Sequence, residues 1–213
     1  MWAIGNYKSF PSLNMHELIV ATKNSRKLKE IRELFADLNL KITSLADYPD
    51  FPSIVEDGDS FHSNAVKKAV TISSRTAKLV MGEDSGLEVK ALDNRPGIYS
   101  ARFAGEGATD EANNSKLLKM LEGVPTAKRQ ARYQCFVALA YQGKIIDVVN
   151  GRCSGIITEE LKGSNGFGYD PLFLIPRYKK TFGELPFRVK AEISHRSRAL
   201  KKLRTALEKF LGR

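Results

Sequence analysis

RQARYQCFVALAYQGKIIDVVNGRCSGII, residues 129–157, contains two long runs in which apolar and polar side chains alternate. This period of two residues is typical of β-strands that bury one face. The intervening Gln142-Gly143-Lys144 predicts a tight turn, so the two runs should form an antiparallel hairpin. Around this hairpin the chain alternates strand-like and helix-like segments, which is typical of β-α-β units. A hairpin beside such units predicts an α/β fold with a mixed sheet.

The other elements follow from hydrophobic periodicity and from residues that cap helices. An acidic turn is expected at GEDSG, where Glu83 and Asp84 are followed by a serine and a glycine between two strand-like runs. The first helix should be capped by Asn24 or Ser25. We predict strands at 17–21, 78–82, 87–92 and 171–175, and helices at about 24–38, 60–76, 109–123 and from residue 195.

Length and composition limit the class of protein. The 213 residues, 42% of them hydrophobic, suit one large domain or one domain with two lobes. We expect residues 1–16 to form an irregular extension and residues 17–213 to form a single two-lobed domain. No run of about 18 apolar residues occurs, so no membrane association is expected. Two cysteines and three scattered histidines make neither a disulfide framework nor a zinc motif, which favours a reduced, cytoplasmic setting.

The net charge of +10 raises the question of nucleic-acid binding. However, the basic residues are spread along the chain, and no helix-turn-helix, zinc-finger or RNP-type pattern accompanies them. Two basic clusters fall on amphipathic helices, where charge usually marks a solvated face. A positive surface also suits a small polyanion such as a nucleotide, so no specific nucleic-acid partner is expected.

A polar junction, ATKNSRK at residues 21–27, joins the first strand to the first helix. The free N–H groups at a helix start attract phosphate, and Lys23 and Lys27 add positive charge. The glycine spacing of a P-loop is absent. The alternative is a capped helix start with two solvated lysines.

Acidic residues gather in two further segments. Glu56, Asp57 and Asp59 precede the second helix, where carboxylates commonly serve as caps. Glu56 becomes a candidate site residue if the fold brings it beside Glu83 and Asp84. Acidic oxygens without nearby histidine or cysteine suit Mg²⁺, and such a carboxylate can also activate water. The alternative for GEDSG is a plain β-turn, and we expect His62 to lie on the surface.

Two segments near the C-terminus could contact a planar ligand. In GSNGFGYDP, residues 163–171, the glycines allow close approach of the backbone, and Phe167 or Tyr169 could stack on a base. The alternative is a flexible glycine loop. Lys190, His195 and Arg196 follow at a predicted helix start and can donate to anionic or carbonyl oxygens. Together the four segments supply groups for a nucleoside triphosphate, and none resembles a covalent nucleophile with its base.

Five segments, taken in order, carry a resemblance to a known family. ATKNSRKLKEI, VEDGDSFHSNAVKKA, EDSGLEVKALDNRPGIYSARFAG, GFGYDPLF and AEISHRS resemble the inosine/xanthosine triphosphate pyrophosphatases, also described as dITP/XTP pyrophosphatases. The resemblance covers the chain from about Glu17 onward. It implies an elongated mixed α/β fold with two lobes and a nucleotide cleft between them, a homodimer, and a requirement for Mg²⁺. It also implies cleavage of ITP, dITP and XTP to the nucleoside monophosphate and pyrophosphate.

The resemblance also implies roles for individual residues. Glu56 and Asp84 would hold Mg²⁺ with support from Glu83, and Asp84 would also be the catalytic general base. The substrate-binding set would be Thr22, Lys23, Asn24, Ser25, Arg26, Lys27, Ser85, Phe167, Gly168, Tyr169, Asp170, Lys190, His195 and Arg196. Of these, Lys190 would reach phosphate, whereas His195 and Arg196 would read the purine edge.

Two positions depart from the family pattern. Many members have glycine where this chain has Lys23, and aspartate where it has Glu83. Two other functions are compatible with the sequence. One is a related nucleotide pyrophosphatase with a different base preference. The other is a basic nucleic-acid-binding module without catalysis, which would leave Glu56, Glu83 and Asp84 unexplained.

Overall fold

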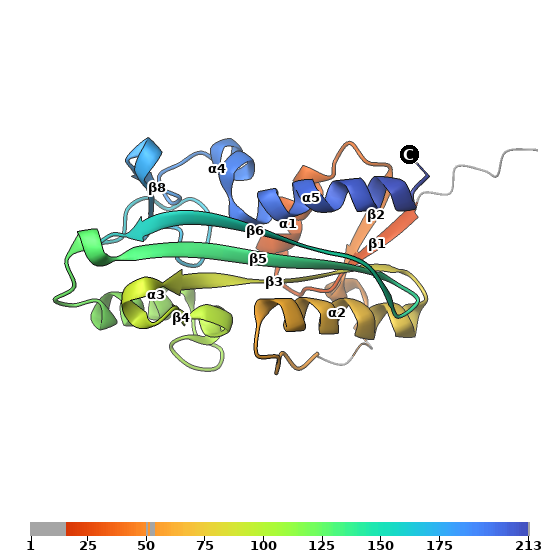
Figure 1. The fold of residues 1–213 in the computed structure, drawn as a ribbon, viewed down its shortest axis with the longest axis horizontal. Coiled ribbons are helices and arrows are strands. Elements are labelled where there is room, and N and C mark those ends of the chain that lie inside the picture. Colours follow the sequence, from red (N-terminus) through yellow and green to blue (C-terminus); the bar gives the residue numbers. More distant parts are fainter. Residues whose placement is uncertain (1–15, 50, 52–53, 213) are drawn as a thin grey trace, which may run out of the picture.

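The fold is built on one mixed β-sheet. The computed structural model describes residues 16–49, 51 and 54–212, so the predicted N-terminal extension lies outside it except for His16, which belongs to the first strand. The sheet order is β2-β1-β3-β5-β6-β7-β8, with β4 paired to β3 (Figure 1). The strands are β1 His16–Val20, β2 Leu40–Ser44, β3 Leu79–Val89, β4 Arg95–Pro96, β5 Gln130–Tyr141, β6 Lys144–Ile157, β7 Phe173–Ile175 and β8 Lys180–Thr181.

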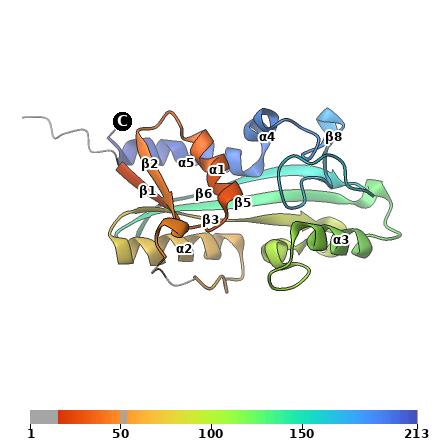
Figure 2. The same cartoon turned by 180° about the vertical axis from the view of Figure 1, so that it is seen from behind.

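Helices cover both faces of this sheet. The α-helices are α1 Ser25–Leu34, α2 Phe61–Thr76, α3 Asp110–Met120, α4 Phe187–Ile193 and α5 His195–Phe210. Short 3-10 helices are η1 Leu45–Asp47, η2 Lys90–Leu92, η3 Gly97–Arg102, η4 Thr126–Lys128 and η5 Pro176–Tyr178. α2 and α3 lie on one face, and α1, α4 and α5 lie on the other (Figures 1 and 2). No helix in the described ranges combines the length and apolarity needed to cross a membrane.

The predicted hairpin and mixed sheet are confirmed. β5 and β6 pair antiparallel along their lengths and are joined by Gln142 and Gly143. Both turn residues have positive φ, 49° and 76°, as the tightest hairpin turns require. β1 pairs parallel with β2 and β3, whereas β3 pairs antiparallel with β5. The parallel units therefore form one end of the sheet and the long hairpin extends beyond them.

The predicted acidic turn is wrong, because β3 runs without interruption from Leu79 to Val89. Every residue of this strand pairs with β5, and this continuous register overrides the local turn signal. Gly82 serves packing instead: a Cβ there would lie 2.1 Å from the Ala65 carbonyl oxygen of α2. Because side chains alternate along a strand, Glu83 and Asp84 point to opposite faces of the sheet.

Helix boundaries mostly follow the predictions. Asn24 caps α1 by accepting from the Arg26 and Lys27 N–H groups, but α1 ends at Leu34 and not near Leu38. α5 begins at His195 as predicted. Lys190 does not share that helix start. It lies in α4, because Ser194 is extended and separates the two helices while capping α5.

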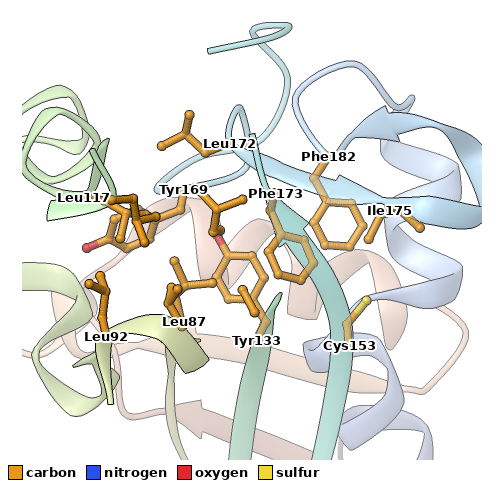
Figure 3. Close-up of a cluster of buried hydrophobic side chains, with 14 of the residues drawn as sticks. Leu87, Leu92, Leu117, Tyr133, Cys153, Tyr169, Leu172, Phe173, Ile175 and Phe182 are labelled. Atoms are coloured by element: carbon orange, nitrogen blue, oxygen red, sulfur yellow. The ribbon is translucent and has the colours of Figure 1, made fainter. Parts of the chain in front are cut away.

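The two largest of four apolar clusters among the described residues lie along the long strands. One, at the end that carries α3 and β8, contains the aromatic residues Tyr133, Phe173 and Phe182 (Figure 3). The other lies between the sheet and the helices α1 and α5 and includes Ile31 and Leu203. Two cores on one set of strands produce an elongated molecule, in agreement with the predicted fold class.

Candidate active site

Two adjoining cavities lie where the parallel part of the sheet ends. β1 pairs with β3 only as far as Met81, and β4 joins the same edge at Glu88. Within the described residues, no strand pairs with this edge of β3 between Gly82 and Leu87. The chain leaving β1 enters α1 here. Ligands in α/β proteins usually bind at such carboxyl ends of parallel strands.

The two cavities differ in chemistry. The first, of about 110 Å³, is called the aromatic cavity because Phe167, Tyr133 and His195 line it. The second, of about 300 Å³, is called the acidic cavity because Glu56, Glu83 and Asp84 line it. The two share Asn24, Lys27, Ser85 and Ala101 as lining residues, so one ligand could extend through both.

The start of α1 supplies the basic side of the acidic cavity. The Thr22 hydroxyl accepts from the Asn24 N–H (3.1 Å), which fixes the bend between β1 and the helix. Lys27 reaches Glu83, with 3.0 Å between its Nζ and Oε2. Lys23 is exposed at the cavity, whereas Ser25 is exposed and lines neither cavity. An anion here would meet both lysines and the first N–H groups of α1.

Asp84 and Glu56 meet around one ammonium group. Lys68 Nζ lies 2.9 Å from Glu56 Oε1 and 3.5 Å from Asp84 Oδ1, and Asn64 Nδ2 donates to Asp84 Oδ2 (3.1 Å). Burial raises the pKa of Asp84, and the neighbouring Glu56 and Glu83 charges add to this effect while Lys68 and Lys27 oppose it. Sequence reasoning missed Lys68, because a lysine on an amphipathic helix ordinarily faces water.

Glu83 belongs to a different cluster on the opposite face of β3. It lies 3.1 Å from Arg196 Nη2, and the Cys135 thiol donates to it (3.4 Å). Burial alone would raise the pKa of Glu83, but Arg196 and Lys27 hold it well below its usual range. Burial, followed by the Glu83 charge, raises the pKa of Cys135 well above its ordinary value. Glu83 is therefore a permanent counter-ion for two cations.

The acidic cavity offers two carboxylates to a metal. Across residues 16–49, 51 and 54–212, no group of three or more His, Cys, Asp or Glu side chains is arranged to hold an ion. Glu56 and Asp84 nevertheless flank one cation already, the Lys68 ammonium. Two carboxylates fit Mg²⁺, which usually takes substrate phosphates and water as its remaining ligands. The donor set present is thus compatible with a magnesium-nucleotide complex.

Buried ion pairs form the floor of the aromatic cavity. Lys190 Nζ lies 2.6 Å from Asp170 Oδ2 and 2.9 Å from Glu30 Oε1. Glu30 also pairs with Arg196 Nη1. Burial would raise the pKa of Glu30, but Arg196 and Lys190 outweigh it and lower this pKa. Sequence reasoning missed Glu30 because its two partners are 160 and 166 residues away in the chain.

Flat side chains form the walls of the aromatic cavity. The Phe167 ring is half-buried and lies 4.5 Å from Lys190 Nζ, measured to the ring centroid. Tyr169 is buried in the core, and its hydroxyl donates to the Ser100 carbonyl (2.8 Å). Of the two aromatic residues predicted to stack on a base, Phe167 therefore keeps the more accessible ring.

His195 is a neutral, buried side chain that lines the aromatic cavity. Its ring stacks on Tyr133 at 4.6 Å between centroids, with the planes 10° apart. Burial, together with the Arg196 and Lys190 charges, lowers the pKa of His195 well below its usual value. His195 Nδ1 and Arg196 Nε have no hydrogen-bond partner within the described part of the chain. Tyr133, which orients this imidazole, was not singled out from the sequence.

The cavities bring together nearly all of the predicted site residues. Those at the aromatic cavity are Asn24, Arg26, Lys27, Ser85, Phe167, Gly168, Tyr169, Asp170, Lys190, His195 and Arg196. Those at the acidic cavity are Thr22, Lys23, Asn24, Lys27, Glu56, Glu83, Asp84 and Ser85. His62 is exposed as predicted and lines neither cavity.

Comparisons with known proteins identify the family of this chain. The dITP/XTP pyrophosphatase of Shouchella clausii is 51% identical over 194 residues, which cover 91% of this chain and 98% of that protein. The dITP/XTP pyrophosphatase of Desulforamulus reducens is 48% identical over 194 residues, which cover 91% and 96%. The structure of a HAM1 protein from Coxiella burnetii superposes with a TM-score of 0.83 at 37% identity, covering 92% of this chain and 100% of that one. The profile of the Ham1 family matches residues 18–206, and the chain therefore belongs to the Ham1 family.

Proposed function

We propose that this chain hydrolyses the deaminated purine nucleoside triphosphates ITP, dITP and XTP to the nucleoside monophosphate and pyrophosphate. The single observation that carries this proposal is the pair of adjoining cavities, one with cations and carboxylates and one with aromatic walls. A triphosphate would lie in the first and a purine in the second, with Lys27 and Ser85 between them. The names of the relatives, dITP/XTP pyrophosphatases, support the same substrate class.

We assign the metal to the carboxylates of the acidic cavity. Glu56 and Asp84 would hold Mg²⁺, which when bound would neutralise charge on the triphosphate. Glu83 would support these two carboxylates, and its ion pairs with Lys27 and Arg196 favour that role. Lys27 and Lys23 would stabilise phosphate oxygens directly. Lys190 lies in the aromatic cavity, so we assign it to the nucleoside and not to phosphate.

Asp84 is the proposed general base. A carboxylate with a raised pKa is a better proton acceptor near neutral pH, and burial raises this one. Asn64 Nδ2 and the Ser85 N–H each donate to one of its oxygens (both 3.1 Å) and fix its orientation. Asp84 would take a proton from a water molecule while the water oxygen bonds to phosphorus. The bond from that phosphorus to the pyrophosphate oxygen breaks, and pyrophosphate leaves.

Base choice follows from donors and acceptors in the aromatic cavity. Hypoxanthine and xanthine present a carbonyl at C6, where adenine presents an amino group. N–H groups of Arg196 would pair with that carbonyl. Facing an amino group, the same donors would stay buried without partners, and a site built for one hydrogen-bond pattern rejects the opposite pattern strongly.

The test is pyrophosphate release from ITP, dITP, XTP, GTP and ATP, each with Mg²⁺ and with EDTA. We expect metal-dependent release from the first three that far exceeds release from GTP and ATP. Release of similar size from all five would contradict the proposed base selection. A response confined to modified pyrimidine triphosphates added to the panel would favour the related pyrophosphatase with a different base preference.

We also propose a homodimer in the cytoplasm. The resemblance to the pyrophosphatase family motivates the dimer, and the two buried free cysteines suit a reducing compartment. Sedimentation equilibrium of the full chain measures the first property. A single species at the monomer mass of 23.7 kDa across micromolar concentrations would contradict it.

A further inference from the structure

Helix α3 holds one residue of the glycine-rich loop at both of its backbone polar atoms. Asp110 Oδ2 accepts from the Gly168 N–H (2.8 Å), and Asn114 Nδ2 donates to the Gly168 carbonyl (3.0 Å). Residues four apart lie on one face of a helix, so both side chains reach the same loop residue. Gly168 has a φ of 62°, a conformation that favours glycine. The two bonds therefore fix the backbone of a residue that a loop would otherwise leave free.

Asp110 is not needed as the cap of its own helix. The Thr109 hydroxyl caps α3 by accepting from the Ala112 N–H. Asp110 instead forms an ion pair with Arg26 of α1, 2.5 Å from its Nη1. The Arg26 guanidinium in turn lies 4.9 Å from the centre of the Phe167 ring. Asp110 thus connects α3 both to the loop and to the helix on the other side of the aromatic cavity.

These contacts lie at the rim of the cavity. The side chains of Arg26 and Asp110 are 52% and 30% exposed, and both line the aromatic cavity together with Phe167. Gly168 directly follows Phe167, and the Phe167 N–H itself donates to Asp170 Oδ2 (2.8 Å), so Asp110 restrains the backbone on one side of Phe167 and Asp170 restrains it on the other. The position of the Phe167 ring therefore depends partly on α3, a helix to which no catalytic group is assigned.

We propose that Asp110 and Asn114 form a clamp that positions Phe167 against the base of the nucleotide. Asp110 is a positioning residue that acts through Gly168. This inference rests on the proposed function, because it takes the aromatic cavity as the site of the base. The Arg26–Asp110 ion pair connects the clamp to α1 at the rim of the cavity.

The clamp predicts that binding and turnover respond differently to mutation. In Asp110→Ala the Gly168 N–H loses its charged acceptor. The backbone that follows Phe167 is then less restrained, although the Phe167 N–H still donates to Asp170. We expect KM for XTP to rise about tenfold, the fold-change of one lost charge-assisted hydrogen bond. The acidic cavity is untouched, so kcat should stay within about twofold, because only binding of the base is lost.

Matched variants separate the clamp from the ion pair. Asp110→Asn keeps an acceptor for the Gly168 N–H but loses the charge that pairs with Arg26, and we expect it to retain most of the affinity. Glu111→Ala removes the neighbouring exposed carboxylate of the same helix turn and should leave KM unchanged. Asn114→Ala removes the second bond of the clamp and should raise KM in the same direction as Asp110→Ala.

Amide hydrogen exchange of the full chain tests the clamp without an activity assay. Peptides that contain Gly168 should exchange faster in Asp110→Ala and Asn114→Ala than in the wild type and Glu111→Ala. Circular dichroism checks that each variant folds, and if Asp110→Ala does not fold, Asn114→Ala carries the test alone.

The outcomes distinguish this inference from the proposed function. Wild-type protein that releases no pyrophosphate from any deaminated purine triphosphate would overturn the function, while exchange would still report on the clamp. An active wild type, with exchange and KM unchanged in both clamp variants, would overturn the inference. Faster exchange with an unchanged KM would also overturn it, because the loop would then be held without positioning the base.

Discussion

Glu83 and Asp84 are neighbours in the chain but belong to different charge clusters. Asp84 faces α2 and its lysine, whereas Glu83 faces α5 and Arg196. Burial raises the pKa of Asp84, and burial opposed by Arg196 and Lys27 leaves the pKa of Glu83 low. The pleat of one strand thus gives two adjacent carboxyl groups opposite properties, one suited to accepting protons and one to balancing cations.

Replacing Asp84 with asparagine tests the first of these roles. The amide keeps the size of the side chain but cannot accept the proton of the attacking water. We expect Asp84→Asn to fold and to lose turnover by about 100-fold or more, as removal of a general base does. The measurement is kcat for ITP. Asp57→Asn is the control, because that carboxylate is exposed, forms an ion pair with Lys67 and lines neither the acidic nor the aromatic cavity. A kcat near that of the wild type would remove Asp84 from this role.

Glu30 offers a second test at the scale of one residue. Its carboxylate pairs with Lys190 and Arg196, so Glu30→Gln leaves two buried cations without full compensation. Breaking a buried ion pair typically costs about 3–5 kcal/mol in the free energy of unfolding. Lys190 and Arg196 should also leave their positions at the aromatic cavity, so we expect KM for XTP to rise by about tenfold or more. Glu33→Gln is the control, because Glu33 is exposed on the same helix. Equal KM values for the two variants would contradict the role of Glu30.

At the scale of elements, the strands and helices with strong periodicity could be predicted from the sequence. The β5–β6 hairpin, the cap of α1 and the start of α5 at His195 are examples, because each depends on neighbouring residues. The continuity of β3 could not be predicted, because its pairing partner lies some fifty residues later and overrides a local turn signal. The short strand β2 and the helix α4 also lacked a strong pattern.

The residues of the candidate site also fall into two groups, those that the sequence indicated and those that only the structure revealed. Lining residues in polar, glycine-rich segments could be identified, because such segments stand out from the periodic pattern. Lys68 and Glu30 could not, because each lies inside a helix and turns inward only to meet carboxylates or cations from distant segments. Their burial depends on tertiary contacts and has no local signal.

The contact between β6 and α5 carries an element-scale prediction. A Cβ on Gly151 would lie 2.1 Å from the His195 carbonyl oxygen and 2.5 Å from the Ala199 nitrogen, so Gly151→Ala must push the start of α5 away. We expect a loss of about 1–3 kcal/mol in the free energy of unfolding, as overpacking typically causes. KM should rise too, because His195 moves with the helix. Urea denaturation compares this variant with Ser154→Ala, an exposed change on the same strand. Equal stabilities would contradict the close packing.

The stability of the whole molecule should respond to acid through Glu17. Its carboxylate accepts from Lys78 Nζ and the Tyr48 hydroxyl (both 2.6 Å) and from the Thr43 hydroxyl (3.1 Å), which ties β1 to its flanking segments. Burial would raise the pKa of Glu17, but the bonds from Lys78, Tyr48 and Thr43 outweigh it and lower the pKa to about 2 from 4.5.

A carboxyl whose pKa is lowered by folding contributes stability that is full above about pH 4.5 and is lost as the pH falls towards 2. Glu17→Gln should therefore be less stable than the wild type at pH 7 by about 1–2 kcal/mol, allowing for screening near the surface. The difference should shrink between pH 4.5 and pH 2. Urea denaturation across this range measures it, with Glu106→Gln as an exposed control. A difference that does not change with pH would contradict the assignment.

The burial of the two cysteine thiols affects how fast they react with oxidants. Cys135 and Cys153 are its only cysteines, and both are reduced and buried. Burial raises the pKa of Cys153 to about 11, and the pKa of Cys135 is raised well above its ordinary value. Peroxides and alkylating reagents attack the thiolate, which neither residue forms near neutral pH. Both buried thiols should therefore react slowly with peroxides and alkylating reagents, although one of them lies directly beside the Glu83 carboxylate.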